Sequence, residues 1–307
     1  MGGNPVFVDS ESDTWNMCPE ALERAIIDRI EITGKKPVAI IPVHLYGMPA
    51  NMDAILSVAG RYGIPVLENA AEALGSRYKG RFCGSFGQFA CLSFNGNKMI
   101  TTSGGGALVC SSAEVAGRVK FLATQARDAA AHYQHSQVGY NYRLSNICAG
   151  IGRGQMLVLE EHVDRRREIN GIYRSLLADM PGITFLANPS DNFESNHWLT
   201  SILVDPDVAG FNREELRLAM EAANIETRPL WKPMHLQPVF ADCPFYTSSG
   251  NLPKNSYSND VNSNLDNSIC SRLFEHGLCL PSSPVLTQND IERVVNVIIK
   301  LASRKLS

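Results

Sequence analysis

The 307-residue sequence contains no run of about 18 consecutive apolar residues, the length that a membrane-spanning helix needs. Its first residues, Met1-Gly2-Gly3-Asn4-Pro5, lack the basic segment and apolar stretch of a secretory signal. The cysteines form no C-x-x-C pair, and no His/Cys cluster has zinc-finger spacing. These absences predict a cytoplasmic protein that is neither secreted nor embedded in a membrane.

The sequence also has little net charge. Its 28 Lys and Arg residues against 31 Asp and Glu residues leave a formal charge of −3, so no general field attracts nucleic acid or an anionic membrane. The apolar share of 44% and the charged share of 19% are typical of a globular protein large enough for two domains. We therefore expect a local binding site, with neither nucleic acid nor membrane among the partners.

The first half of the chain alternates short apolar runs with helical patterns. Apolar runs at residues 5–8, 38–43 and 65–68 are separated by helical patterns at residues 19–30 and 52–62. This rhythm predicts a βαβαβ series in a mostly parallel sheet, with functional groups at the carboxyl ends of its strands. Asn51 is expected to cap the second helix and Gly63 to end it.

The second half predicts a change of architecture. Two apolar segments at residues 89–94 and 107–110 flank a polar loop, and helical patterns follow at 112–126 and 155–178. The second of these helices is expected to cross from a large domain, residues 1–165, into a smaller one, residues 166–307. The apolar runs at 183–186 and 198–204 and the helical patterns at 213–223 and 288–302 predict that the smaller domain is α+β. Residues 248–267, rich in Ser and Asn, predict a surface loop.

Several motifs extend over nearly the whole chain. They are VLENAAEALGS at residues 66–76, GSFG at 84–87, SFNGNK at 93–98, and further segments at 121–128, 132–135, 139–143 and 228–238. Together they resemble the DegT/DnrJ/EryC1/StrS sugar aminotransferases, and within that group the enzymes of bacillosamine and exopolysaccharide synthesis. The resemblance implies an α/β protein of fold type I, similar to aspartate aminotransferase, with a mostly parallel large-domain sheet. It also implies pyridoxal 5'-phosphate as cofactor, L-glutamate as amino donor and a UDP-linked 4-keto-6-deoxy-N-acetylhexosamine as acceptor.

The resemblance identifies Lys98 as the lysine that bonds covalently to the cofactor and then moves protons between substrate and cofactor. This chemistry needs an amine that is partly desolvated and can lose its proton. The alternative, for a lysine taken without its motif, is an exposed loop residue. A related branch of the family has histidine at this position and performs dehydration, so Lys98 indicates transamination.

Three further side chains are implied to contact the cofactor. Ser93 matches the hydroxyl that contacts the phosphate, and Glu72, one helical turn after Asn69, matches the residue at the ring-hydroxyl side. Asn141 matches the asparagine that reaches the cofactor phosphate of the partner subunit, which implies a homodimer with shared active sites. The alternatives are that Ser93 caps its own turn and that Glu72 is an ordinary residue of a helix surface.

Five residues are candidates for the substrate side. His44 and Tyr46 follow a predicted strand end and either line the pocket or pack beside it. Arg228, Trp231 and His235 belong to a motif that implies a wall of the substrate pocket, where an arginine pairs with an anionic group. Trp231 fits a core position equally well.

Two other patterns are assigned no ligand. The run at residues 104–106, three glycines, lacks P-loop spacing and is better explained as a tight turn. His132 and His135 have no acidic or cysteine partner at ligand spacing, so we expect no metal site.

The chain departs from the family pattern at Asn69, where the family has aspartate. A carboxylate stabilises the protonated pyridine nitrogen of the cofactor and so makes the ring an electron sink, whereas an amide cannot. The barrier to reaction is expected to rise by roughly 3–4 kcal/mol. Family members also carry a segment before residue 5 that grips the cofactor phosphate through a helix N-terminus. The chain is therefore expected to be an N-terminally incomplete fragment, an alternative start or a degenerate copy.

The sequence leaves three hypotheses. The first is a transaminase of nucleotide-linked keto sugars. The second is an inactive homologue that keeps the fold or sugar binding but not turnover. The third is a regulator, which ranks last because the chain has neither a helix-turn-helix motif nor a basic segment.

Overall fold

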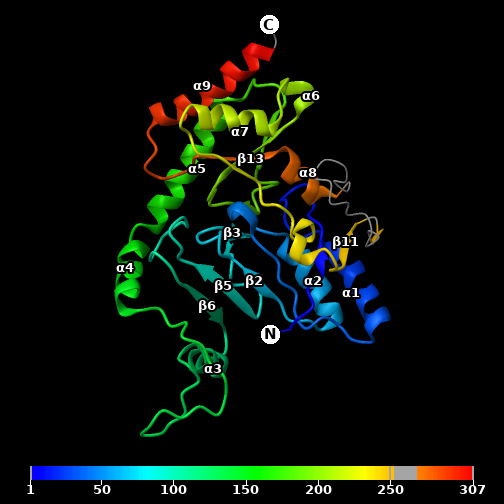
Figure 1. The fold of residues 1–307 in the computed structure, drawn as a ribbon, viewed down its shortest axis with the longest axis vertical. Helices are drawn as coiled ribbons and strands as arrows, with labels where there is room; N and C mark the ends of the chain where they lie inside the picture. Colours follow the sequence, from blue (N-terminus) through cyan, green and yellow to red (C-terminus); the bar gives the residue numbers. More distant parts are fainter. Residues whose placement is uncertain (1, 249, 252–267, 306–307) are drawn as a thin grey trace.

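The structure is a computed structural model that describes residues 2–248, 250–251 and 268–305 (Figure 1). Its central sheet consists of β2 (Leu67–Asn69), β5 (Phe89–Ser93) and β6 (Gly106–Cys110). β2 and β5 are parallel and β6 is antiparallel to β5, which confirms the expected pair of strands around a polar loop. In the described part of the chain, no helix is long and apolar enough to cross a membrane.

The segment at residues 38–43 joins this sheet only through two isolated parallel bridges, Ile40 to Val66 and Val43 to Asn69. The expectation of a regular strand there was wrong. The backbone N–H and C=O of Ile40 both bond to the β2 side of the sheet. Pro42 stands two residues later, where the next N–H of the ladder is needed, and proline has none.

Two helices, α1 (Pro19–Thr33) and α2 (Met52–Tyr62), pack against the central sheet. Their buried side chains form one apolar cluster with residues of the sheet, made of Leu22, Ile26, Ile40, Ala50, Met52, Ile55, Val58, Ala59, Ile64, Val66 and Tyr78. Asn51 Oδ1 accepts the N–H of Ala54, and Gly63 ends α2 with a φ of 58°. Both expected helix ends are therefore confirmed.

The first strand lies in a different sheet from the one expected. β1 (Phe7–Val8) pairs in parallel with β11 (Phe245–Thr247), which pairs with β12 (Gly250–Asn251). An apolar run predicts a strand but not its partner, and this partner lies far along the chain. Within residues 248–267, only Ser248 and β12 are described, so the predicted surface loop falls largely outside the described residues.

The C-terminal part is an antiparallel sheet covered by helices, as expected for an α+β unit. Its strands, in spatial order, are β10 (Arg228–Pro229), β13 (Gly277–Leu280), β9 (Thr200–Val204) and β7 (Ile183–Phe185). α5 (Leu159–Leu176), α7 (Arg213–Ala222) and α9 (Gln288–Lys305) share its apolar core. α5 runs between the two parts (Figure 1), and the division at residue 165 stays a prediction.

Smaller elements complete the described chain. They are the strands β3 (Arg77–Tyr78), β4 (Arg81–Phe82) and β8 (Phe193–Glu194), and the helices α6 (Pro206–Ala209) and α8 (Ile269–His276). Short 3-10 turns occur at Leu45–Gly47, Met234–Leu236 and Pro238–Phe240. β3 pairs with β8, which joins the segment after β2 to the C-terminal part. The segment that contains Asn196 and Trp198 follows β8 directly.

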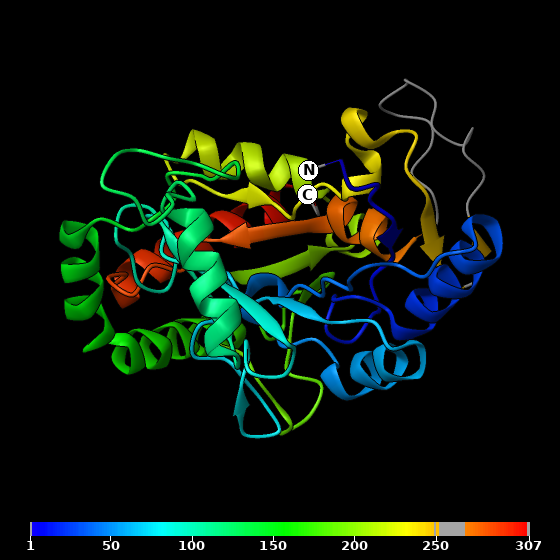
Figure 2. The ribbon, with the colours of Figure 1, turned by 90° about the horizontal axis from the view of Figure 1, so that it is seen from below.

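β6 leads into an arm that contains α3 (Ala113–Ala123), residues 124–145 and α4 (Asn146–Met156), and neither helix has a buried residue. The first part of the arm, α3 and the loop after it, lies on the side away from the C-terminal sheet in Figure 1 and in front of the central sheet in Figure 2, and the last part, α4, leads back to α5. Several large apolar side chains of the arm are exposed by about three quarters or more, namely Tyr133, Val138, Tyr142 and Ile147. A surface of this kind is typical of an interface between subunits.

Candidate active site

The carboxyl ends of two parallel strands bring the first candidate residues together. Asn69 ends β2 opposite Cys91 of β5, and Ser93 ends β5 two residues later. The Asn69 Oδ1 atom accepts the N–H of Ala71 at 3.2 Å, and the Ser93 hydroxyl accepts the N–H of Asn95 at 3.4 Å. Both side chains are therefore used in local turns, and both lie where an α/β protein places its functional groups.

Lys98 and Glu72 meet at this edge of the sheet. The Lys98 Nζ atom lies 3.5 Å from Glu72 Oε1, and the two side chains are only 13% and 12% exposed. The ammonium also lies 4.1 Å from the centre of the Trp198 ring, within the range of a cation–π contact. Trp198 Nε1 donates to the carbonyl of Asn97, the residue before Lys98, at 2.7 Å. Lys98 is thus largely desolvated, and its ammonium contacts both the Glu72 carboxylate and the Trp198 ring.

The Glu72 carboxylate is held by a second contact besides Lys98. Its Oε2 atom accepts the backbone N–H of Tyr46 at 2.8 Å. Burial raises the pKa of the Glu72 carboxyl, and the charge of Lys98 together with the Tyr46 N–H offsets only part of this effect. The carboxyl can therefore take up a proton beside the lysine more readily than an exposed glutamate.

Aromatic side chains close the site. Tyr46 is buried and its hydroxyl accepts the N–H of Trp231 at 2.7 Å. The Trp231 ring lies 5.8 Å from the Tyr46 ring and 6.3 Å from the Trp198 ring, and Trp231 is 41% exposed. Tyr46 therefore packs beneath the site, whereas Trp231 keeps a face available at its rim.

His44 is placed under the site rather than in it. It is fully buried, and its Nδ1 atom accepts the N–H of Ala50 at 3.0 Å. That nitrogen therefore carries no proton, and Nε2 donates to Glu68 at 3.0 Å. Of the two interpretations left open by the sequence, the geometry supports packing.

Glu68 is a buried carboxylate that sequence reasoning missed. It accepts the backbone N–H groups of Gly84, Phe86 and Gly87 at 2.6–2.7 Å, in addition to His44. Burial raises the pKa of this carboxyl, but the bonds from His44 and from the amides outweigh it, so the pKa lies below its ordinary value of 4.5. The carboxylate ties the end of β2 to the turn that precedes β5.

We expect Glu68→Gln to lower the free energy of unfolding at pH 7 by about 3 kcal/mol, because the glutamine NH2 group would replace an oxygen that accepts two of the four hydrogen bonds and would face two N–H donors. Since the folded pKa lies below the unfolded one, the stabilisation by Glu68 is complete above pH 4.5 and is lost as the pH falls through the folded value. The difference between variant and wild type should shrink below pH 4.5. Urea unfolding from pH 7 to pH 3.5 measures it.

The control for this prediction is Glu221→Gln. Glu221 also has an ion-pair partner, Arg217, but its side chain is 67% exposed. Its loss should cost less than about 1 kcal/mol. Equal effects of the two substitutions would show that the Glu68 network does not stabilise the fold.

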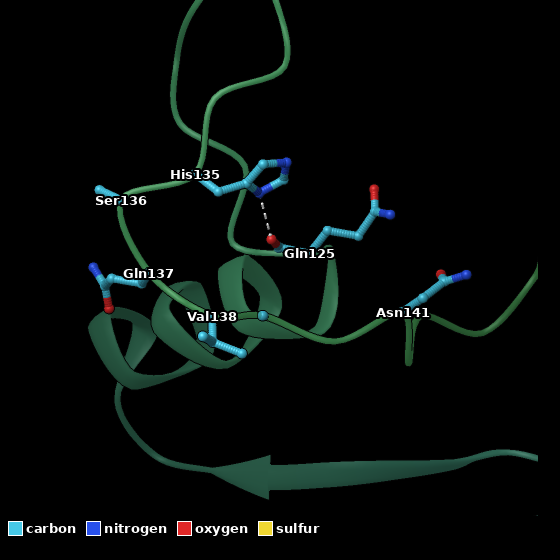
Figure 3. Close-up of a pocket in the computed structure, with 7 residues that line it drawn as sticks. Gln125, His135, Ser136, Gln137, Val138 and Asn141 are labelled. Carbon is cyan, nitrogen blue, oxygen red and sulfur yellow. Dashed lines mark hydrogen bonds between the residues drawn. The ribbon is translucent and has the colours of Figure 1, made fainter.

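Three candidates lie apart from Lys98. Arg228 forms an exposed ion pair with Glu226. His235 is buried and stacks on Phe245 with ring centres 3.6 Å apart. Asn141 is exposed on the arm, where it lines a hollow with Gln125 and residues 135–139 (Figure 3).

The residues around Lys98 fit pyridoxal 5'-phosphate. They supply a nearly dehydrated amine, a carboxyl beside it, a strand-end hydroxyl and an indole at the rim. The family whose model covers residues 1–299 carries the description DegT/DnrJ/EryC1/StrS aminotransferase family. The chain belongs to this family. The family and its named relatives are pyridoxal-phosphate-dependent aminotransferases, and the family expected from the motifs is confirmed.

Individual relatives agree with this assignment. Over 97% of its length, the chain is 46% identical to EpsN of Bacillus subtilis, which bears the name of a pyridoxal phosphate-dependent aminotransferase, and it covers 71% of that protein. It is 33% identical to a GDP-perosamine synthase of Caulobacter vibrioides over 96% of this chain and 72% of the relative. A crystal structure of a family member from Brucella abortus matches with a TM-score of 0.83 and 28% identity, over 98% of this chain and 74% of that one. The expected fold type I is therefore confirmed.

Sequence reasoning also missed Asn196 and Trp198. Trp198 stood in an apolar run that predicts a strand, and nothing in such a run shows that one ring faces a lysine a hundred residues earlier. Asn196 had no signal at all. Both are fully or almost fully buried between β8 and β9.

Proposed function

We propose that the chain transfers the amino group of L-glutamate to the 4-keto carbon of a UDP-linked 4-keto-6-deoxy-N-acetylhexosamine. The observation that carries this proposal is Lys98, a desolvated amine 3.5 Å from the Glu72 carboxyl and covered by the Trp198 ring. The bound cofactor stores the amino group between the two half-reactions. The presence of lysine at this position favours amino transfer over the dehydration found in the branch with histidine.

The chain's own residues have distinct tasks in this proposal. Lys98 moves the proton at the substrate carbon, and Glu72, which binds both Lys98 and the Tyr46 N–H, holds it in place. Ser93 would offer its hydroxyl to the phosphate of the bound cofactor, and Asn69 would be the side chain at its ring nitrogen. The exposed face of Trp231 forms a wall for the sugar, and Arg228, whose ion pair is open to solvent, is available to an anionic diphosphate.

The nucleotide of the sugar substrate has its own test. The Caulobacter relative is named for a GDP-linked product, whereas the motifs resemble enzymes of UDP-linked sugars. The experiment is an absorbance scan of the purified chain with added cofactor. We expect a visible band that disappears on addition of L-glutamate and returns with the UDP-linked keto sugar. Return with only the GDP-linked sugar would correct the nucleotide, and the absence of any band would contradict the proposed function.

A second candidate is an inactive homologue that retains the fold or sugar binding. Asn69 favours it, because an amide replaces the carboxylate that normally faces the cofactor ring. This candidate predicts a visible band that glutamate does not change. The same scan therefore separates the two.

We further propose a homodimer with shared sites. The exposed apolar side chains of the arm support it, as does the position of Asn141 on that arm, far along the chain from Lys98. Mixing Lys98→Ala chains with Asn141→Ala chains should restore activity to about a quarter of the wild-type level, because random pairing of equal amounts makes half of the dimers mixed, each with one intact site. Activity no higher than in the separate variants would contradict shared sites.

A further inference from the structure

Asn196 lies at the point where the C-terminal part meets the residues that surround Lys98. It is fully buried between β8 and β9, and its side chain makes three hydrogen bonds. Nδ2 donates to the carbonyls of Glu72 and Leu74 at 3.0 and 2.9 Å, and Oδ1 accepts the N–H of Trp198 at 2.8 Å. One amide thus binds both of the residues that contact the lysine.

Two of these bonds fix the residues that contact Lys98. Through the Glu72 carbonyl, Asn196 fixes the backbone whose carboxylate lies 3.5 Å from Lys98 Nζ. Through its Oδ1 atom it closes a turn that sets the direction of Trp198, whose ring covers the same ammonium. We infer that Asn196 is the positioning residue for Lys98, through these two neighbours and without contact to the lysine itself.

Close packing around Asn196 supports the inference. Its backbone N–H donates to the Ser76 hydroxyl at 3.0 Å, and that hydroxyl donates to the carbonyl of Gly47 at 2.6 Å. Gly47 has a φ of 89°, and a Cβ atom there would lie 1.8 Å from Asn196 Oδ1. Glycine is therefore needed at residue 47 so that the asparagine can reach its partners.

The inference rests on the proposed role of Lys98, but its test does not need the cofactor. In the cofactor-free chain, the rate at which Lys98 reacts with an amine-specific reagent is measured by peptide mass spectrometry, relative to the exposed Lys36. We expect Asn196→Ala to raise this ratio about tenfold, because losing bonds of this kind frees the neighbours that shield the amine. The glutamate half-reaction of the loaded enzyme should slow by about the same factor, since small misplacements of reacting groups cost this much or more.

Two further variants keep the test decisive. Asn170→Ala removes another buried asparagine, one that bonds to Thr200 and to neither Glu72 nor Trp198, and it should leave the ratio within about twofold of wild type. If Asn196→Ala does not fold, Asn196→Ser decides, because a serine hydroxyl can still accept the Trp198 N–H two residues on but does not reach the carbonyls of Glu72 and Leu74. We expect it to raise the Lys98 ratio about threefold, which is half of the alanine effect on a logarithmic scale.

Equal ratios for the Asn196 variants and wild type would overturn the inference, as would equal effects of Asn196→Ala and Asn170→Ala. Failure of the proposed function looks different. In that case the wild-type chain would not attach the cofactor to Lys98, whereas the Lys36-referenced reactivity would still respond to Asn196.

Discussion

Replacing Lys98 by alanine is expected to lower the rate of amino transfer by roughly four powers of ten. A positioned proton-transfer group alone contributes up to about this factor, and the same amine also provides the covalent attachment of the cofactor. The loss should appear in kcat of both half-reactions. We expect a small loss of stability, because the Glu72 carboxyl keeps its bond from the Tyr46 N–H and, with its pKa raised by burial, can take up a proton once the lysine is gone.

The matched control is Lys79→Ala. Lys79 also has a carboxylate partner, Asp53, and an aromatic neighbour, Tyr78, but its side chain is 48% exposed and lies away from Glu72. Its removal should change the rate by less than about twofold, as for most surface substitutions. Stopped-flow measurement of each half-reaction gives the comparison. A Lys98→Ala chain that keeps more than about a tenth of the wild-type rate would exclude Lys98 as the reacting amine.

Asn69→Asp is expected to raise the rate of the glutamate half-reaction by about two powers of ten, the usual size of one lost electrostatic group. The substitution keeps the shape of the side chain, and its oxygen can still accept the Ala71 N–H. The new carboxylate would stabilise the protonated ring nitrogen, which the amide cannot do. Single-turnover kinetics with glutamate measures the change.

Asn51→Asp serves as the control for this gain. Asn51 caps α2, and aspartate caps a helix as well as asparagine does, so the same chemical change should leave the rate unaltered there. An unchanged rate in Asn69→Asp would mean either that this side chain does not face the ring nitrogen or that proton removal does not limit the rate. The rates with ordinary glutamate and with glutamate deuterated at its α-carbon separate those two explanations. Only the second explanation abolishes the isotope effect.

Much of the fold was predictable because its elements are locally encoded. Residues 52–62 have an N-cap, an apolar face and a terminal glycine, and the structure shows a helix with those bounds. What the sequence could not give is pairing between distant segments. β1 was expected in the central sheet, but its partner is β11, and a two-residue apolar strand contains no information about which edge it joins.

The same contrast, between local patterns and contacts of distant segments, holds for the candidate site. Lys98, Glu72 and Trp231 belong to motifs, and the structure brings them together. Asn196 acts through backbone carbonyls more than a hundred residues away, and such a contact leaves no spacing in the sequence. His44 and His235 were indistinguishable from pocket residues by pattern alone, and only burial shows that their rings are packed.

The central claim is that Lys98 is the residue that holds the cofactor. Its most direct test is borohydride reduction of the purified chain with pyridoxal 5'-phosphate, followed by peptide mapping. The account predicts that one cofactor per chain becomes fixed to the peptide that contains Lys98, and that the Lys98→Ala chain fixes none. Label on another lysine, with Lys98 unmodified, would contradict it.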